Sequence, residues 1–229
     1  MKLQINRRRK IDNLSQYIEH TLLKQDAGKE ALLKLFEEAK EYEFKGVCVN
    51  PCNVALAKEK LRGSKVKVVT VVGFPLGASV STVKAFEAET AIADGADEID
   101  MVLNVGALKD KNYPLVKSDI ETVKKACKNH VLKVILETDL LEKDEIQKAC
   151  EICASAGADF VKTSTGFVKN GVGARVEDVE LMYKTVAPYG LGVKASGGIR
   201  DREKALALVK AGVARLGTSS GVQIVKGDE

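Results

Sequence analysis

Ala156-Gly157-Ala158-Asp159, followed by Phe160-Val161-Lys162-Thr163-Ser164, is the stretch that decides the fold, because this junction recurs along the chain. An Ala- and Glu/Lys-rich helical stretch ends at Gly157, which can take the left-handed conformation that closes a helix. A short, largely apolar run follows, as expected for a strand covered on both faces. Similar junctions lie at Asp94-Gly95-Ala96-Asp97, Ala211-Gly212-Val213-Ala214 and, more loosely, Phe44-Lys45-Gly46. Helices that alternate with such strands predict parallel βαβ units.

Working outward from these junctions, the sequence predicts eight strands, at residues 18–22, 46–50, 66–73, 98–104, 133–138, 160–165, 192–196 and 214–219. Amphipathic helices are expected at residues 29–43, 81–93, 113–127, 142–156, 176–186 and 201–210, with Ser81 and Asp201 as N-caps. No linker-like segment divides the chain, so we expect one (β/α)8 TIM barrel over 1–229, with a short N-terminal helical extension over 1–16. A doubly wound open sheet is the alternative, but no GxGxxG motif follows the first strand.

Composition excludes several classes of protein. The 229 residues include 36 Lys and Arg against 32 Asp and Glu, and a net charge of +4 is too small to indicate nucleic-acid binding. The basic run Arg7-Arg8-Arg9-Lys10 has no interleaved aromatic residues, and we interpret it as a solvated turn. The longest apolar stretch, residues 68–76, is too short to cross a membrane. Because the chain also opens without a signal-peptide pattern, we expect a cytoplasmic protein.

Cysteine and histidine usage argues against a metal centre or a disulfide scaffold. Five cysteines are an odd number, and reduced thiols are the simplest interpretation. Cys150 and Cys153 form a CxxC, but it lies inside a helical pattern, which favours buried helix cysteines over a redox or zinc site. His20 and His130 are the only histidines, so the sequence offers no multi-histidine metal site.

Three charged residues are predicted to lie inside buried strands. Because side chains alternate along a strand, Asp100 faces the barrel interior together with Val102 and Asn104, while the apolar residues between them face the helices. Lys162 and Lys194 stand in the middle of two further strands. A lone strand lysine is usually an edge or snorkelling residue. Two lysines and an aspartate on three strands of one barrel instead indicate a functional site.

The chemistry of such a group is that of an amine nucleophile. Adjacent ammonium groups lower one another's pKa, and burial lowers it further, so we expect a neutral amine near pH 7. A neutral lysine can attack a carbonyl and form a Schiff base. The carboxylate could hold the second lysine, or a water molecule, for proton transfer.

Two glycine-rich turns predict a phosphate site. Ser196-Gly197-Gly198-Ile199-Arg200 follows the seventh strand, and Gly217-Thr218-Ser219-Ser220-Gly221 follows the eighth. Loops at these two positions, with free backbone N–H groups, form the usual phosphate site of a barrel. Arg200 could add positive charge to it.

Six segments together resemble deoxyribose-phosphate aldolases, over about residues 17–225. They are Val47-Cys48-Val49-Asn50-Pro51, Val72-Gly73-Phe74-Pro75-Leu76-Gly77, Glu98-Ile99-Asp100-Met101-Val102-Leu103-Asn104-Val105-Gly106, Phe160-Val161-Lys162-Thr163-Ser164-Thr165-Gly166-Phe167, Val193-Lys194-Ala195-Ser196-Gly197-Gly198-Ile199-Arg200 and Gly217-Thr218-Ser219-Ser220-Gly221. The resemblance implies a class I aldolase that needs no metal or other cofactor. Such an enzyme reversibly cleaves 2-deoxy-D-ribose 5-phosphate to D-glyceraldehyde 3-phosphate and acetaldehyde.

The resemblance also assigns roles to residues. Lys162 matches the Schiff-base lysine, Lys194 the second lysine that perturbs it, and Asp100 the aspartate of a proton relay. The residues that match the substrate- and phosphate-binding loops are Gly166, Ser196, Gly197, Gly198, Arg200, Gly217, Ser219 and Ser220, and those expected to line the pocket are Glu19, Thr21, Cys48 and Thr163. The implied partners are a sugar phosphate and acetaldehyde, with no nucleic acid and no membrane, and the chain is expected to form a dimer or tetramer.

Two departures from the family pattern affect these expectations. The family's opening strand usually reads Ile-Asp-His-Thr-Leu, whereas this chain has Ile18-Glu19-His20-Thr21-Leu22, and the extra methylene could move a carboxylate that contacts substrate hydroxyls. The chain also ends without the extended tail ending in Tyr that some relatives carry. The alternative functions are a transaldolase-like enzyme, a sugar-phosphate isomerase, or a barrel that binds a sugar phosphate without turnover.

Overall fold

Eight parallel strands close into a barrel in the computed structural model, which describes residues 13–227. Each strand pairs with the next, and β1 also pairs with β8, which closes the sheet. The strands are β1 (Ile18–Leu22), β2 (Gly46–Val49), β3 (Lys67–Val72), β4 (Glu98–Val102), β5 (Val131–Ile135), β6 (Phe160–Lys162), β7 (Gly192–Ser196) and β8 (Arg215–Thr218). The predicted (β/α)8 barrel is therefore confirmed.

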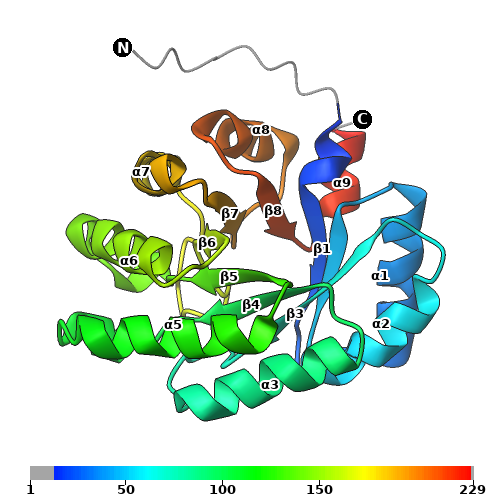
Figure 1. Ribbon diagram of the computed structural model, residues 1–229. Coiled ribbons are helices and arrows are strands. Elements are labelled where there is room, and N and C mark those ends of the chain that lie inside the picture. The colour runs from blue at the N-terminus through cyan, green and yellow to red at the C-terminus, as the bar shows by residue number, and fades with distance from the viewer. Residues whose placement is uncertain (1–12, 228–229) are drawn as a thin grey trace.

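Helices follow every strand and surround the barrel (Figure 1). They are α1 (Lys29–Glu41), α2 (Val54–Lys60), α3 (Ser81–Ala93), α4 (Val105–Lys109), α5 (Tyr113–Cys127), α6 (Lys143–Ser155), α7 (Val176–Val186), α8 (Arg202–Ala211) and α9 (Gly221–Lys226). The sequence predicts all of these except α2, α4 and α9. These three helices have only seven, five and six residues, too few to show a helical period clearly.

One of the two expected N-caps is correct. The Asp201 side chain accepts a hydrogen bond from the Lys204 backbone N–H at 2.7 Å and so caps α8. The Ser81 prediction is wrong, because Ser81 is already the first residue of α3 and the N-cap position is occupied by Val80. A helical extension is expected over residues 1–16. The structure describes only its last residues, which begin a short 3-10 helix at Leu14–Tyr17. Residues 1–12, including the basic run Arg7-Arg8-Arg9-Lys10, lie outside the described part.

Strand register separates an apolar outer layer from a polar barrel interior. Residues that pair across parallel strands point to the same face, so the pairs Asp100↔Lys133 and Lys162↔Lys194 place four charged side chains inside the barrel. The alternate residues, such as Ile99, pack outward against the helices in one large core cluster. The hydrophobic core therefore lies between strands and helices, and leaves the interior free to carry charge.

Candidate active site

Asp100 joins the two predicted lysines inside the barrel. Its Oδ2 atom accepts a hydrogen bond from Lys162 Nζ at 2.8 Å and another from Lys194 Nζ at 2.7 Å. Asp100 and Lys194 are completely buried, whereas Lys162, at the C-terminal end of β6, is 3% exposed. Because the catalytic face of such a barrel lies at the C-terminal ends of the strands, Lys162 is the lysine placed nearest to an incoming substrate.

Lys133 is a third buried lysine in this group, and sequence reasoning assigned it no role. Its Nζ lies 3.0 Å from Asp100 Oδ1 and 2.6 Å from Glu98 Oε2, and its side chain is completely buried. The sequence did carry a signal for it, because Lys133 stands in an otherwise apolar strand and shares the interior face with Asp100. All three lysines therefore approach the same aspartate.

Glu19 is a second carboxylate that contacts the buried lysines of this network. Its carboxylate pairs directly with Lys194 and also lies 3.5 Å from Lys133 Nζ and 3.4 Å from Arg215 Nε. With a side chain only 1% exposed, it faces the lysines rather than the open end of the barrel. Glu19 thus belongs to a basic cluster and is not a freely available contact for substrate hydroxyls.

The lysines of this network stabilise the charged form of its carboxylates. Burial alone would raise the pKa of Asp100, but Lys133, Lys162 and Lys194 outweigh burial and hold this pKa well below its ordinary value. Burial likewise opposes charge on Glu19, and Lys133 and Lys194 lower the pKa of its carboxyl. Both carboxylates are therefore ionised at neutral pH.

For Lys194 the structure contradicts the expectation of a depressed pKa. Burial does disfavour its charged form, but Asp100 and Glu19, which both contact its ammonium group, outweigh burial and raise the pKa of Lys194 above its usual range. The same balance, with burial outweighed by Asp100 and Glu19, raises the pKa of Lys133. Sequence reasoning derived the pKa from lysine against lysine and, although it placed Asp100 beside the second lysine, it did not include Glu19 as an ion-pair partner of that lysine. Lys194 is a charged residue in this site.

The predicted pocket-lining residues divide into two groups. Thr21 and Cys48 pair across β1 and β2 on the interior face, and Cys48 is fully buried with Phe74 packed against its cluster. Burial raises the pKa of the Cys48 thiol, so this cysteine stays neutral. Thr163 instead ties two strand ends together: its hydroxyl donates to the Ser196 carbonyl and accepts from the Ser196 N–H, both at 3.0 Å.

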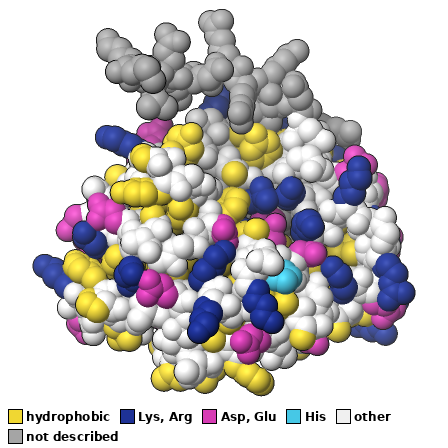
Figure 2. Space-filling model, in the orientation of Figure 1, with side chains coloured by type: hydrophobic (Ala, Val, Ile, Leu, Met, Phe, Trp, Pro, Cys, Tyr) yellow, Lys and Arg dark blue, Asp and Glu magenta, His cyan; other side chains and the backbone are white. Residues whose placement is uncertain are grey.

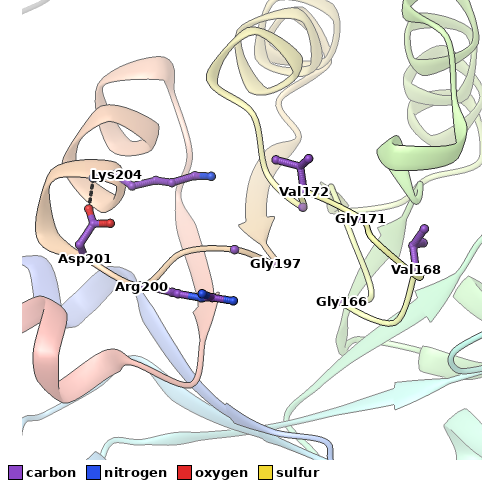
Figure 3. Close-up of a pocket in the computed structure, with 10 residues that line it drawn as sticks. Gly166, Val168, Gly171, Val172, Gly197, Arg200, Asp201 and Lys204 are labelled. Carbon is purple, nitrogen blue, oxygen red and sulfur yellow. Dashed lines mark hydrogen bonds between the residues drawn. The ribbon is translucent and has the colours of Figure 1, made fainter.

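A pocket of about 420 Å³ opens beyond the ends of β6 and β7. Its lining includes four of the residues predicted to bind phosphate: Gly166, Gly197, Gly198 and Arg200. Figure 3 shows Arg200 and Lys204 extending from the α8 side of the pocket toward the loop that contains Gly166 and Val172. Sequence reasoning missed Lys204, although it stands in the first turn of the helix that Asp201 caps.

The remaining predicted phosphate residues lie beside this pocket and do not line it. Ser196 is buried and its hydroxyl donates to the Ser164 carbonyl at 2.6 Å. Gly217 faces the barrel interior, where a Cβ would come within 3.1 Å of Lys194 Cε, so glycine leaves room for that lysine. Ser219 is exposed, and the backbone N–H of Ser220 donates to the Thr218 hydroxyl at 3.0 Å.

The remaining features concern the cysteines, metal-binding groups and membrane-spanning helices. Cys150 and Cys153 are buried within α6, and all five cysteines are free thiols. Residues 13–227 contain no group of three His, Cys, Asp or Glu side chains arranged to hold a metal ion. In the same part of the chain, no helix is long and apolar enough to cross a membrane. Figure 2 shows Lys and Arg side chains interspersed with carboxylates and apolar groups on the visible face.

A parallel barrel whose interior holds three lysines on one carboxylate, beside a glycine-lined pocket with two cations, is typical of a lysine-dependent enzyme that acts on an anionic carbonyl compound. Sequence comparison specifies this class. Residues 15–227 match the family model described as DeoC/LacD family aldolase. The chain belongs to this aldolase family.

Individual relatives cover almost the whole chain. A deoxyribose-phosphate aldolase of Streptococcus sanguinis is 58% identical over 94% of this chain and 97% of the relative. A deoxyribose-phosphate aldolase of Finegoldia magna is 57% identical over 93% of this chain and 99% of the relative. Among solved structures, the tetrameric deoxyribose phosphate aldolase of Aeropyrum pernix is 34% identical with a TM-score of 0.86, covering 93% of this chain and 89% of that one. The solved structure of an aldolase called QR15 is 41% identical with a TM-score of 0.89, and the match covers 94% of this chain and 95% of that one.

Proposed function

We propose that this protein is a class I aldolase that reversibly cleaves 2-deoxy-D-ribose 5-phosphate to D-glyceraldehyde 3-phosphate and acetaldehyde. The observation that carries the proposal is the shared contact of Lys162 and Lys194 with Asp100 Oδ2, at 2.8 and 2.7 Å. The names of relatives that match over nine-tenths of the chain support the choice of substrate.

Lys162 is the proposed nucleophile, and the charge balance of the interior supports this choice. The ion-pair network holds four cationic side chains (Lys133, Lys162, Lys194 and Arg215) and three carboxylates (Glu19, Glu98 and Asp100). Loss of one proton from a lysine leaves equal numbers of positive and negative charges. Lys194 and Lys133 each contact two or more carboxylates, whereas Lys162 contacts only Asp100 among the described residues, so the Lys162 amine is the one held by the fewest ion pairs.

The neutral amine then starts the cleavage reaction. Lys162 Nζ attacks the C1 aldehyde of the open-chain sugar, and loss of water gives an iminium ion. Removal of the C3 hydroxyl proton breaks the C2–C3 bond, whose electron pair flows into the iminium. Glyceraldehyde 3-phosphate leaves, and the enamine is protonated at C2. Hydrolysis of the resulting imine releases acetaldehyde and regenerates the amine.

Asp100 and Lys194 are proposed to move the protons of these steps. Their 2.7 Å hydrogen bond joins an ionised carboxylate to a charged ammonium group, which is an acceptor and a donor in direct contact. Asp100 Oδ2 also contacts Lys162, so the relay begins at the nitrogen that bears the iminium. Because that cationic nitrogen accepts the electrons of the breaking bond, the chemistry requires no metal or organic cofactor.

The substrate phosphate is proposed to bind in the pocket beyond β6 and β7. Gly197 and Gly198 both have positive φ, which glycine adopts readily, and lie at the start of the loop that leads into α8. Arg200 and Lys204 supply positive charge, and Gly166 forms the opposite wall. We assign Ser219 and Ser220 to the same site as neighbours from the β8–α9 junction, because β8 pairs with β7.

We infer further that the protein assembles as a dimer or tetramer and works in the cytoplasm. The tetrameric Aeropyrum relative supports self-assembly. Five free cysteines, four of them buried, support a reducing compartment.

The proposal is tested by trapping the covalent intermediate. The protein is incubated with acetaldehyde and sodium borohydride, and its intact mass is measured before the modified peptide is mapped. One ethyl group on Lys162 is the expected result. A label on Lys194 would reverse the two lysine roles, and absence of any label in the presence of acetaldehyde would overturn the aldolase mechanism.

A further inference from the structure

The loop between β6 and α7 forms one wall of the pocket without regular structure of its own. It spans residues 163–175 and supplies half of the lining residues: Gly166, Val168, Gly171, Val172 and Gly173. Within the loop, one backbone hydrogen bond joins Gly171 N–H to the Val168 carbonyl at 3.0 Å. A loop with so few internal bonds must take its position from contacts with neighbouring segments.

Glu137 holds the beginning of this loop. It lies just after β5 in the left-handed conformation (φ 62°), and its side chain is buried. One carboxylate oxygen accepts the Thr165 backbone N–H at 3.0 Å, and the other accepts the Thr165 hydroxyl. The Thr165 hydroxyl in turn accepts the Phe167 N–H at 3.0 Å. Through Thr165, Glu137 therefore holds the backbone on both sides of Gly166.

Asp139, two residues further on, holds the end of the same loop. Its Oδ2 accepts the Gly173 N–H at 2.7 Å, and its Oδ1 lies 3.2 Å from Arg175. Gly173 packs directly on the other wall of the pocket, since a Cβ there would lie 2.4 Å from the Gly197 backbone. The next residue, Ala174, donates to the Gly197 carbonyl at 3.1 Å. Asp139 thus fixes the contact between the two walls.

We propose that Glu137 and Asp139 are positioning residues for phosphate recognition. From the β5–α6 turn, their carboxylates accept hydrogen bonds from both ends of the loop at 163–175, and these bonds set the width of the pocket. Neither carboxylate belongs to the Asp100 network, and neither lines the pocket. This inference rests on the proposed function, because it assigns a role in binding the phosphate of the substrate.

The test compares the phosphorylated sugar with the same sugar without phosphate. Kinetic constants for 2-deoxyribose 5-phosphate and for 2-deoxyribose are measured in the wild type, in Asp139→Ala and in Glu137→Ala. The expected result is a KM for the phosphorylated sugar at least about tenfold higher, the cost of misplacing one or two hydrogen bonds to an anion. For Asp139→Ala, kcat/KM for 2-deoxyribose is expected to change less than about twofold, because the chemistry at Lys162 is untouched.

Controls separate positioning from general damage to the fold. Asp139→Asn keeps an acceptor for the Gly173 N–H and is expected to restore most of the discrimination. Asp144→Ala removes an exposed carboxylate from the first turn of α6 and should behave as the wild type. A variant that lowers kcat/KM for both sugars by the same factor keeps the wild-type discrimination between them and counts against the positioning role.

Two outcomes would count against different claims. If the wild type prefers the phosphorylated sugar and Asp139→Ala and Glu137→Ala keep the same preference, the positioning role is refuted and the proposed function stands. If the wild type cleaves neither sugar, the proposed function itself fails. Calorimetric titration with inorganic phosphate gives a readout that does not depend on turnover: binding is expected to weaken in Asp139→Ala and to be unchanged in Asp144→Ala.

Discussion

Replacing Asp100 by Asn tests the centre of the site with a change of one atom. In the wild type, Asp100 accepts from Lys162 at 2.8 Å, Lys194 at 2.7 Å and Lys133 at 3.0 Å. In the variant, Lys194 keeps its contact with Glu19, and Lys133 keeps its two other carboxylate partners. Lys162 loses its only ionic partner among the described residues. The effect should therefore fall on the proposed nucleophile while the fold is maintained.

The expected size of the effect follows from two contributions. A hydrogen bond to a charged group contributes about 1.5–3 kcal/mol, so misplacing the Lys162 amine alone should cost roughly 10- to 150-fold in rate. Loss of the carboxylate that moves protons should cost a further factor of roughly 10² to 10⁴. Together they predict that kcat of Asp100→Asn falls by at least about 10³-fold.

The assay is cleavage of 2-deoxyribose 5-phosphate, with glyceraldehyde 3-phosphate measured by a coupled reaction. Circular dichroism and urea unfolding establish that the variant is folded. Asp94→Asn, which removes an exposed carboxylate at the end of α3, is the matched control and should keep the wild-type rate. A folded Asp100→Asn protein with kcat within tenfold of the wild type would refute the reasoning.

Three further predictions follow from the same geometry. Lys162→Ala should abolish both turnover and borohydride labelling with the fold intact, and a near-normal rate in this variant would exclude Lys162 as the nucleophile. Ser219→Glu should raise KM for the phosphorylated sugar by charge repulsion with little change in kcat, and an unchanged KM would remove Ser219 from the phosphate site. The free energy of unfolding should fall as the pH drops below about 4, because the Asp100 pKa is lowered in the folded state and the unfolded chain binds protons first. Urea unfolding at pH 3–6 should show a smaller loss for Asp100→Asn than for the wild type, and equal losses would contradict the depressed pKa.

Part of the site was predictable because it depends only on alternation along a strand. Asp100, Lys162 and Lys194 interrupt apolar strands, and any closed parallel barrel brings the interior faces of its strands together. The glycine-rich turns after β7 and β8 were equally visible in the sequence, and the positive φ of Gly197 and Gly198, which glycine adopts readily, explains the glycines of the first turn. The end of β4 was predicted too far along, because Asn104 leaves the strand and its side chain caps α4 instead.

The electrostatics of the site was not predictable in the same way. From the sequence, two neighbouring lysines suggested depressed pKa values for both. The fold places Glu19 and Asp100 against Lys194, and so raises its pKa instead. A pKa depends on distances of a few ångströms between side chains from distant strands. Glu19 and Lys194 are 175 residues apart in the chain, but their strands β1 and β7 face one barrel interior.

The sequence by itself therefore determined the barrel, its polar interior face and the candidate residues Asp100, Lys162 and Lys194 on that face, because strand periodicity and glycine positions are local properties. Only the tertiary structure decided that the pKa of Lys194 is raised, that Lys133 joins the network, and that Glu137 and Asp139 hold the loop at 163–175. These contacts join segments whose relative positions are set by closure of the whole barrel, and no local pattern encodes them.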